Sequence, residues 1–166
     1  PSCVVELTAT PVSGNNVLHH VSAAELKAEE MIKLPIVLAE HPDGWRACLR
    51  DALLTRTNLE AVAQNEPDYV RPIVLIQAEP KGGEATVDVV RQHLLEELNI
   101  SEDQIKVATG TQKELDGVDL FDPACPVRYV ITVEALKEGW DCSFAYVLAS
   151  LQSVKSAKDV EQLLGR

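Results

Sequence analysis

The sequence predicts an α/β fold: an open, mainly parallel sheet with helices on both faces. Short apolar runs alternate with longer amphipathic segments along most of the chain, and this alternation is typical of right-handed β-α-β crossovers. One run, Ile73–Ile76, is apolar at every position, which indicates a strand that is covered on both faces.

Length and composition fit one ordinary globular core. The chain has 166 residues, of which 46% are apolar and 25% are charged, so wholesale disorder is excluded. Aromatic residues make up only 4%, and Leu, Val, Ile and Ala must therefore fill the core. No apolar run is long enough to cross a bilayer, and a membrane is not expected as a partner.

The charge and the cysteines restrict the function further. The net charge is −11, whereas a domain that coats nucleic acid without specificity is usually basic. The cysteines are irregularly spaced and contain no C-x-x-C pair: Cys3, Cys48, Cys125 and Cys142. We therefore expect neither a metal site nor a disulfide framework, and a reducing, cytoplasmic location.

The first expected elements are short. Residues 3–7 form an apolar run that predicts a strand, and the threonine-rich segment 8–11 ends it because its proline cannot continue the ladder. Ser22 and Glu25 have the spacing of a capping box, which predicts the start of a short helix.

Another strand and a long helix come next. Residues 36–38 are apolar and predict a strand, and His41-Pro-Asp-Gly44 predicts a turn after it. From Trp45 onward the apolar residues recur at helical spacing. They predict a long helix with one buried face, formed by Trp45, Cys48, Leu49, Ala52, Leu53, Leu59 and Val62.

After Pro67 strands and helices alternate regularly. Four strands are expected, at Ile73–Ile76, Ile105–Ala108, Val127–Thr132 and Ala145–Ser150. The apolar spacing from Val87 to Leu98 predicts a helix after the first of these strands, with Asn99 as its C-cap. Ser156 predicts the start of a last helix.

Three further segments contain residue types that are suited to chemistry. They are Thr8-Ala-Thr10, Glu138-Gly-Trp-Asp141 and Gln162-x-x-Gly165-Arg166. In an open parallel sheet, ligands bind at the carboxyl ends of the strands, and the first two segments follow expected strands. Each segment alone is a weak signal, but together and in this order they are a strong one.

The order of these segments resembles the second half of a superfamily 2 helicase motor, and most closely the Res subunit of type III restriction enzymes. Four segments are similar to helicase motifs III, IV, V and VI, in that order: Leu7–Pro11, Ile73–Gln77, Ile131–Asp141 and Gln162–Arg166. The Glu-Gly-Trp-Asp-Cys segment and residues 26–35 resemble the Res subunit in particular. The resemblance thus covers nearly the whole chain.

This resemblance implies a RecA-like fold and a domain organisation. Residues 1–20 would be the end of a first motor domain, including motif III, followed by the connector between the domains. Residues 21–166 would be the second RecA-like helicase domain, truncated within motif VI.

The resemblance also assigns roles to residues. Arg166 would be the catalytic arginine, because a guanidinium offers a planar set of donors that neutralises charge on a transferring phosphoryl group. ATP would be bound by Gly139, Asp141, Gln162 and Gly165. The threonines Thr8, Thr10 and Thr132 would contact nucleic-acid phosphates and couple them to the ATP state. Hydroxyl contacts of this kind need no net positive charge.

Two other motor motifs are missing from these residues. The sequence contains no Gly-x-x-x-x-Gly-Lys-Ser/Thr phosphate loop and no Asp-Glu metal-binding box. We therefore expect ATP and Mg²⁺ to bind only in a longer protein, between two motor domains, and this chain alone to be inactive. The resemblance implies duplex DNA, the first motor domain and a methyltransferase subunit as partners, with a nuclease domain following.

Alternative interpretations stay open on the sequence alone. The protein could be a helicase-like ATPase without a nuclease, or a non-catalytic RecA-like scaffold for protein interactions. At the level of residues, Arg166 could be a solvated terminal side chain and Asp141 a turn-forming residue. Cys142 fits a small buried residue better than a nucleophile, because no histidine is near it in sequence.

Overall fold

A computed structural model describes residues 5, 14, 16–29, 37–133 and 142–152. The chain divides into two compact units, residues 1–39 and 40–166. In the first unit, helix α1 (Ala23–Ala28) begins with the expected capping box. The Ser22 backbone N–H and hydroxyl donate to Glu25 Oε2 at 2.7 and 2.8 Å, and the Glu25 N–H donates to the Ser22 hydroxyl at 3.2 Å. The hydrogen bonds from the Ser22 backbone and hydroxyl lower the pKa of Glu25.

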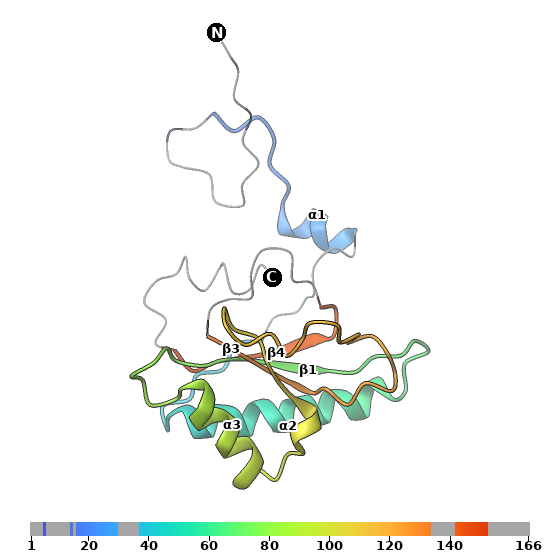
Figure 1. Ribbon diagram of the computed structural model, residues 1–166. Coiled ribbons are helices and arrows are strands. Elements are labelled where there is room, and N and C mark those ends of the chain that lie inside the picture. Colours follow the sequence, from blue (N-terminus) through green and yellow to red (C-terminus); the bar gives the residue numbers. More distant parts are fainter. Residues whose placement is uncertain (1–4, 6–13, 15, 30–36, 134–141, 153–166) are drawn as a thin grey trace. The chain divides into compact units, whose positions relative to one another are not determined.

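The second unit contains a sheet of four parallel strands in the order β2-β3-β1-β4 (Figure 1). Their bounds are β1 (Ile73–Gln77), β2 (Ile105–Val107), β3 (Tyr129–Thr132) and β4 (Ala145–Ser150). All four expected strands are present and all pair in parallel, so the predicted α/β class is confirmed and is consistent with a RecA-like fold. Every residue of β3 is buried, and so is every residue of β1 except the half-buried Leu75, which explains why these two sequences are apolar without alternation.

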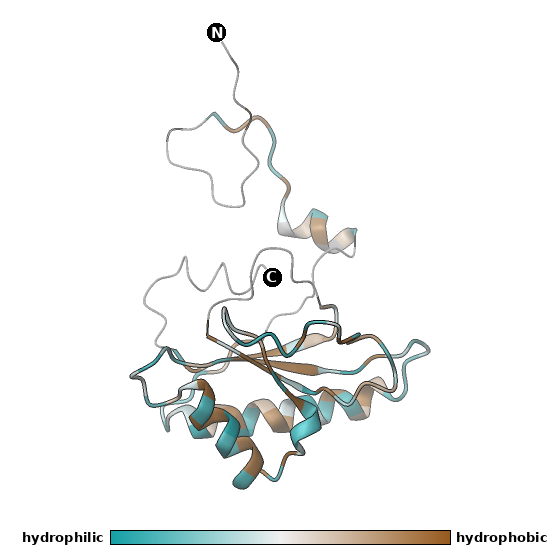
Figure 2. Cartoon of the chain, viewed as in Figure 1, coloured by the Kyte–Doolittle hydropathy of each residue, from teal (hydrophilic) through white to brown (hydrophobic). Residues whose placement is uncertain are grey.

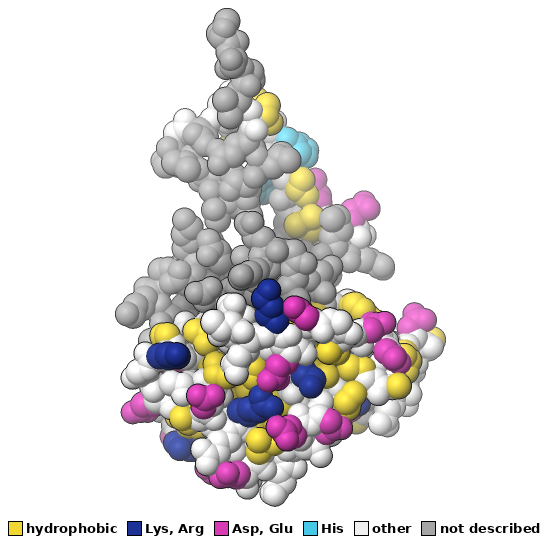
Figure 3. All heavy atoms as spheres, viewed as in Figure 1, with side chains coloured by type: hydrophobic (Ala, Val, Ile, Leu, Met, Phe, Trp, Pro, Cys, Tyr) yellow, Lys and Arg dark blue, Asp and Glu magenta, His cyan; other side chains and the backbone are white. Residues whose placement is uncertain are grey.

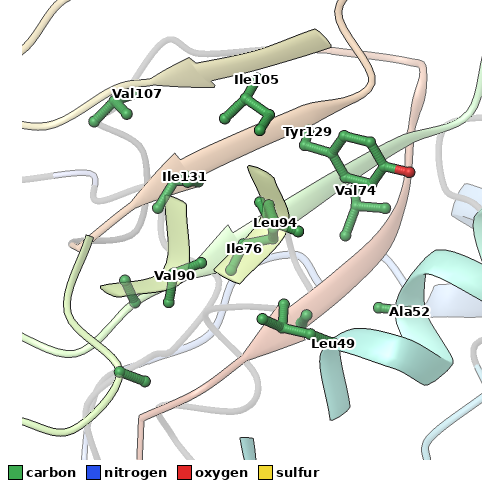
Figure 4. Close-up of a cluster of buried hydrophobic side chains, with 13 residues drawn as sticks. Leu49, Ala52, Val74, Ile76, Val90, Leu94, Ile105, Val107, Tyr129 and Ile131 are labelled. Atoms are coloured by element: carbon green, nitrogen blue, oxygen red, sulfur yellow. The ribbon is translucent and has the colours of Figure 1, made fainter. Parts of the chain in front are cut away.

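Two helices lie on the same face of this sheet (Figure 1). They are α2 (Trp45–Ala63) and α3 (Val87–Glu96), and a short 3₁₀ turn, η1 (Glu102–Gln104), precedes β2. Their apolar sides pack on the strands in the larger core cluster, which includes Leu49, Val74, Leu94 and Ile131 (Figure 4). Figure 2 shows the result, with hydrophobic residues along the strands and hydrophilic ones on the outer helix surfaces.

The other face of the sheet is covered by the long connection between β2 and β3, which contains no α-helix, so the helices expected on both faces are found on one face in the described residues. A smaller cluster forms there from Ile73, Leu120, Val127, Val130, Cys142 and Phe144. Right-handed crossovers explain this arrangement: β2 and β3 are reached in opposite directions across the sheet, so their connections must cross opposite faces. The cluster confirms Cys142 as a buried small residue. The predicted last helix, from Ser156, lies outside the described residues.

The turns, caps and short strands predicted from local sequence are only partly confirmed. The turn before α2 is confirmed, since Gly44 has φ +88°. The C-cap predicted at Asn99 is wrong in position: the C-cap of α3 is Glu97, and Asn99 follows two residues later with the left-handed φ of +53° that ends the helical path. The strand predicted at residues 36–38 is wrong for its described part, because Val37 and Leu38 belong to no strand and are 86% and 71% exposed. A run of three apolar residues forms a strand only beside a hydrogen-bonded neighbour, and no described strand pairs with Val37 or Leu38. Of the strand predicted at 3–7, only Val5 is described, and it is in no strand.

The surface of the described part mixes charges of both signs. On the face seen in Figure 3, basic and acidic side chains are interspersed among apolar ones over the second unit. Within the described residues, no helix combines the length and the apolar character that a membrane span requires.

Candidate functional site

The site expected for an open parallel sheet is the crevice between two neighbouring strands whose connections leave toward opposite faces. Here those strands are β1 and β3. The chain leaves β1 toward α3 on the helical face, whereas the chain that leaves β3 returns through Cys142 and Phe144 on the opposite face. The candidate site is therefore the carboxyl end of β1 and β3, together with the adjoining end of β4.

The strand ends at this edge are level with one another. Gln77, the last residue of β1, is in register with Thr132 of β3 and Ser150 of β4. The Ala78 N–H donates to Thr132 O at 2.7 Å, and the Leu151 N–H donates to Gln77 O at 2.8 Å. The Ser150 hydroxyl donates to Gln77 Oε1 at 2.9 Å. Neutral amide and hydroxyl groups thus join the three strands.

One residue just beyond β4 bridges the crevice itself. The half-buried Gln152 donates from its side-chain nitrogen to Ala78 O at 2.7 Å and to Val133 O at 2.6 Å. These carbonyls belong to the residues that directly follow β1 and β3. A single side-chain amide therefore satisfies two acceptors at the point where the strands diverge.

The loop from β1 to α3 forms one wall of the site. The Glu79 N–H donates to Ala85 O at 2.8 Å, and the Ala85 N–H donates to Glu79 Oε2 at 2.9 Å. Between them, Gly82 has φ +99°, and Gly83 lies so close to Glu79 that a Cβ at position 83 would be 2.6 Å from Glu79 Cβ. Lys81 is exposed at the tip of this loop.

The loop after β2 forms a second polar wall. The Gln112 N–H donates to the Thr109 hydroxyl at 3.0 Å, and the Thr109 N–H donates to Gln112 O at 2.8 Å, so the loop closes on itself. Thr111 and Lys113 are exposed there.

Glu114 anchors this loop to the outer edge of β2. Its carboxylate accepts from the Val107 N–H at 2.9 Å and from Arg91 at 2.9 Å, and the Glu114 N–H donates to Val107 O at 3.0 Å. Burial by itself would raise the pKa of Glu114, but the hydrogen bonds from Arg91 and Val107 outweigh it and the pKa is lowered. Glu114 thereby occupies both backbone hydrogen-bonding groups of Val107.

Only one of the predicted site residues lies in the described part of the chain. Thr132 is at the carboxyl end of β3, as expected, but only 2% of it is exposed. The other predicted residues lie outside the described residues: Thr8, Thr10, Gly139, Asp141, Gln162, Gly165 and Arg166. The structure therefore brings Thr132 to the expected edge beside Gln77 and gives no position for the rest.

The amino end of the sheet holds a second concave feature. A groove of about 420 Å³ is lined there by Glu60, Glu66, Asp68 and Arg128, among others. The Glu60 carboxylate accepts from Arg56 at 2.7 Å and from Arg128 at 3.1 Å. Acidic side chains and a basic side chain thus face this groove.

Sequence reasoning missed the role of Gln152 at this site. Its polar character directly after an apolar strand was the available signal, but its two partners are 74 and 19 residues away in the chain. Among the described residues, no group of three or more His, Cys, Asp or Glu side chains could hold a metal ion. No protein-family model, no curated protein and no solved structure matches the chain.

Proposed function

We propose that this chain is the second RecA-like motor domain of an ATP-dependent DNA translocase, in the Res subunit of a type III restriction endonuclease. One observation carries the proposal: the carboxyl ends of β1, β3 and β4 are level and adjacent. The segments similar to motifs IV, V and VI are β1 itself and the stretches that follow β3 and β4. In that strand order β1 ends, and the chain leaves β3 and β4, at one edge of the sheet, which is where the proposal expects the motif V and motif VI segments to act.

The chemistry of this edge suits contacts with a nucleic-acid backbone. Phosphate oxygens accept hydrogen bonds from hydroxyls, side-chain amides, backbone N–H groups and lysines. The two exposed loops of the edge offer Lys81 with Gly82, and Thr111 with Lys113. Thr132 is buried, so its role in the proposal is to hold the end of β3 in register rather than to bind phosphate from the surface.

ATP would bind between this domain and a first motor domain that contains the phosphate loop and the metal-binding carboxylates. Gly139, Asp141, Gln162 and Gly165 would face the nucleotide, and Mg²⁺ would be held by the first domain. Arg166 would stabilise the charge that develops on the γ-phosphate in the transition state. Closing and opening of the two domains would then move the protein on duplex DNA.

The test uses the intact protein that contains this chain, with ATP hydrolysis measured with and without duplex DNA. Arg166→Ala should lower DNA-stimulated kcat by about a hundredfold or more, with a far smaller change in ATP affinity. Arg166→Lys should recover little, because a point charge does not replace the planar set of donors. Arg50→Ala, at an exposed arginine of α2, is the control and should leave kcat unchanged.

Two results would contradict the proposal. Near-normal stimulated turnover of Arg166→Ala would remove the catalytic role from this arginine. ATP hydrolysis by the purified 166-residue chain alone would show that it does not need a separate phosphate loop.

A further inference from the structure

We infer that Gln152 is a positioning residue of the motor. At the carboxyl edge it ties the chain after β4, which leads to the motif VI segment, to the chain after β3, which belongs to the motif V segment. The inference rests on the proposed function, because that function places the working groups on these two segments. It concerns two described residues: Val133, which lies within the motif V segment just after β3, and Gln152, which follows β4 and precedes the motif VI segment in the sequence.

The contacts are short and they join distant parts of the chain. Gln152 Nε2 lies 2.6 Å from Val133 O and 2.7 Å from Ala78 O. Because β1 lies between β3 and β4, the Gln152 side chain reaches from β4 across the end of the central strand to the far neighbour. The side chain therefore spans all three strands that the proposed function uses.

The amide group is chemically specific for this position. Both partners are carbonyl oxygens, which only accept, so one atom must donate twice. A carboxylate at position 152 would face two acceptors and repel them, and an aliphatic side chain would leave both without this donor. Asparagine is one methylene shorter, so its nitrogen would fall short of both carbonyls.

The hydrogen bond between Ser150 and Gln77 at the same edge joins two strands rather than three. The Ser150 hydroxyl donates to Gln77 Oε1 at 2.9 Å, which links β4 to β1 but does not reach β3. Loss of Gln152 would remove the direct link between the chain after β4 and the chain after β3, whereas loss of the Ser150 hydroxyl would not. Ser150→Ala is therefore a matched control at the same edge.

The consequence for the motor is a specific kinetic signature. The two segments would no longer start from a fixed separation, so DNA binding and phosphoryl transfer would be coupled less tightly. The affinity for ATP should change little, because Gln152 is not a nucleotide contact in the proposed function.

The functional experiment measures DNA-stimulated kcat and the KM for ATP in the intact protein. Gln152→Leu and Gln152→Glu should lower stimulated kcat roughly tenfold, with KM changed less than about twofold, at a temperature at which both variants are fully folded. Gln152→Lys should recover part of kcat, since an ammonium can donate to both carbonyls. Ser150→Ala should keep kcat within about twofold of the wild type.

The structural experiment uses the 166-residue chain and measures exchange of the Gln152 side-chain amide protons by NMR. Both protons should exchange more slowly than those of Gln92, whose side chain is exposed on α3. Exchange of Gln152 as fast as that of Gln92 would overturn the inference.

The outcomes separate the inference from the proposed function. A wild-type protein without DNA-stimulated hydrolysis would overturn the proposed function, and the positioning role with it. A stimulated wild type with an unchanged Gln152→Leu variant would overturn the positioning role alone. An equal loss in Ser150→Ala would also overturn it, because the effect would then belong to the edge in general.

Discussion

The two ends of the sheet are held together by different chemistry. At the amino end, Arg71 is 99% buried and donates to Tyr69 Oη at 3.2 Å, to Asp122 O at 2.9 Å, to Cys125 O at 2.6 Å and to Leu120 O. At the carboxyl end, the corresponding links come from the uncharged side chains of Gln77, Ser150 and Gln152.

This difference separates stability from function. A buried guanidinium is costly to leave without partners, so the contacts of Arg71 fix the connection between β2 and β3 against the sheet. Neutral hydrogen bonds contribute about 1 kcal/mol each, so the loss of one link at the carboxyl end costs less stability than the loss of Arg71. The contacts of Arg71 thus maintain the fold at the amino end, whereas the carboxyl end is the working edge of the proposed function.

The largest loss in the free energy of unfolding is expected at the amino end of the sheet. Arg71→Met removes the donor from three backbone carbonyls around residues 120–125 and should lower the free energy of unfolding by about 3 kcal/mol or more. Urea denaturation of the chain measures this loss. Arg50→Met, at an exposed arginine, should change the free energy of unfolding by less than about 0.5 kcal/mol. A loss below about 1 kcal/mol for Arg71→Met would remove the basis of the comparison.

An intermediate loss of stability is expected in the loop between β1 and α3, at the carboxyl edge. Gly83→Ala would place a Cβ 2.6 Å from Glu79 Cβ, so the loop between β1 and α3 must shift, at a cost of about 1–3 kcal/mol. The control is Gly110→Ala, because a Cβ at that glycine meets open space. Unfolding midpoints of the two variants measure the difference. Equal midpoints would mean that Glu79 does not hold this wall.

The smallest effect is expected at Glu114, and it depends on pH. The folded pKa of Glu114 lies below the ordinary value of 4.5, so its contribution to stability is present above that value. It is lost as the pH falls through the folded pKa, when the carboxylate is protonated. Glu114→Gln should therefore be about 1 kcal/mol less stable than the wild type at neutral pH.

Urea denaturation of the wild type and of Glu114→Gln at decreasing pH tests the direction of this pH dependence. The difference between wild type and Glu114→Gln should shrink as the pH falls below 4.5. A difference that grows in acid would contradict the ion pair between Glu114 and Arg91.

The sequence predicts the fold well because the signals for it are local. Continuous apolar runs such as Ile73–Ile76 identify buried parallel strands, and helical spacing correctly places Leu49 and Ala52 on the buried side of α2. The predicted face is wrong at its end, because Val62 is 60% exposed and Arg56, which pairs with Glu60, is buried instead. The run at 36–38 fails because its composition does not say whether a neighbouring strand exists to pair with it. The expected position of Thr132 at the end of β3 is confirmed.

The rest of the site depends on register between distant strands. Gln152 meets Ala78 and Val133 only because β4, β1 and β3 end at the same level, and sequence spacing does not give this alignment. The same is true of Arg71, whose partners follow about 50 residues later in a connection without regular structure. The burial of Thr132 likewise follows from its place in a central strand rather than from its residue type.

Titration of the ¹⁵N-labelled chain with short duplex DNA at low salt tests the assignment of the working edge most directly, because every backbone amide except that of proline reports on its own surroundings. The account predicts that the amide shifts change in the loops at residues 79–83 and 109–113 and stay constant at residues 66–71, beside the amino-end groove. Shifts confined to the amino-end groove, or no shifts at either end, would contradict it.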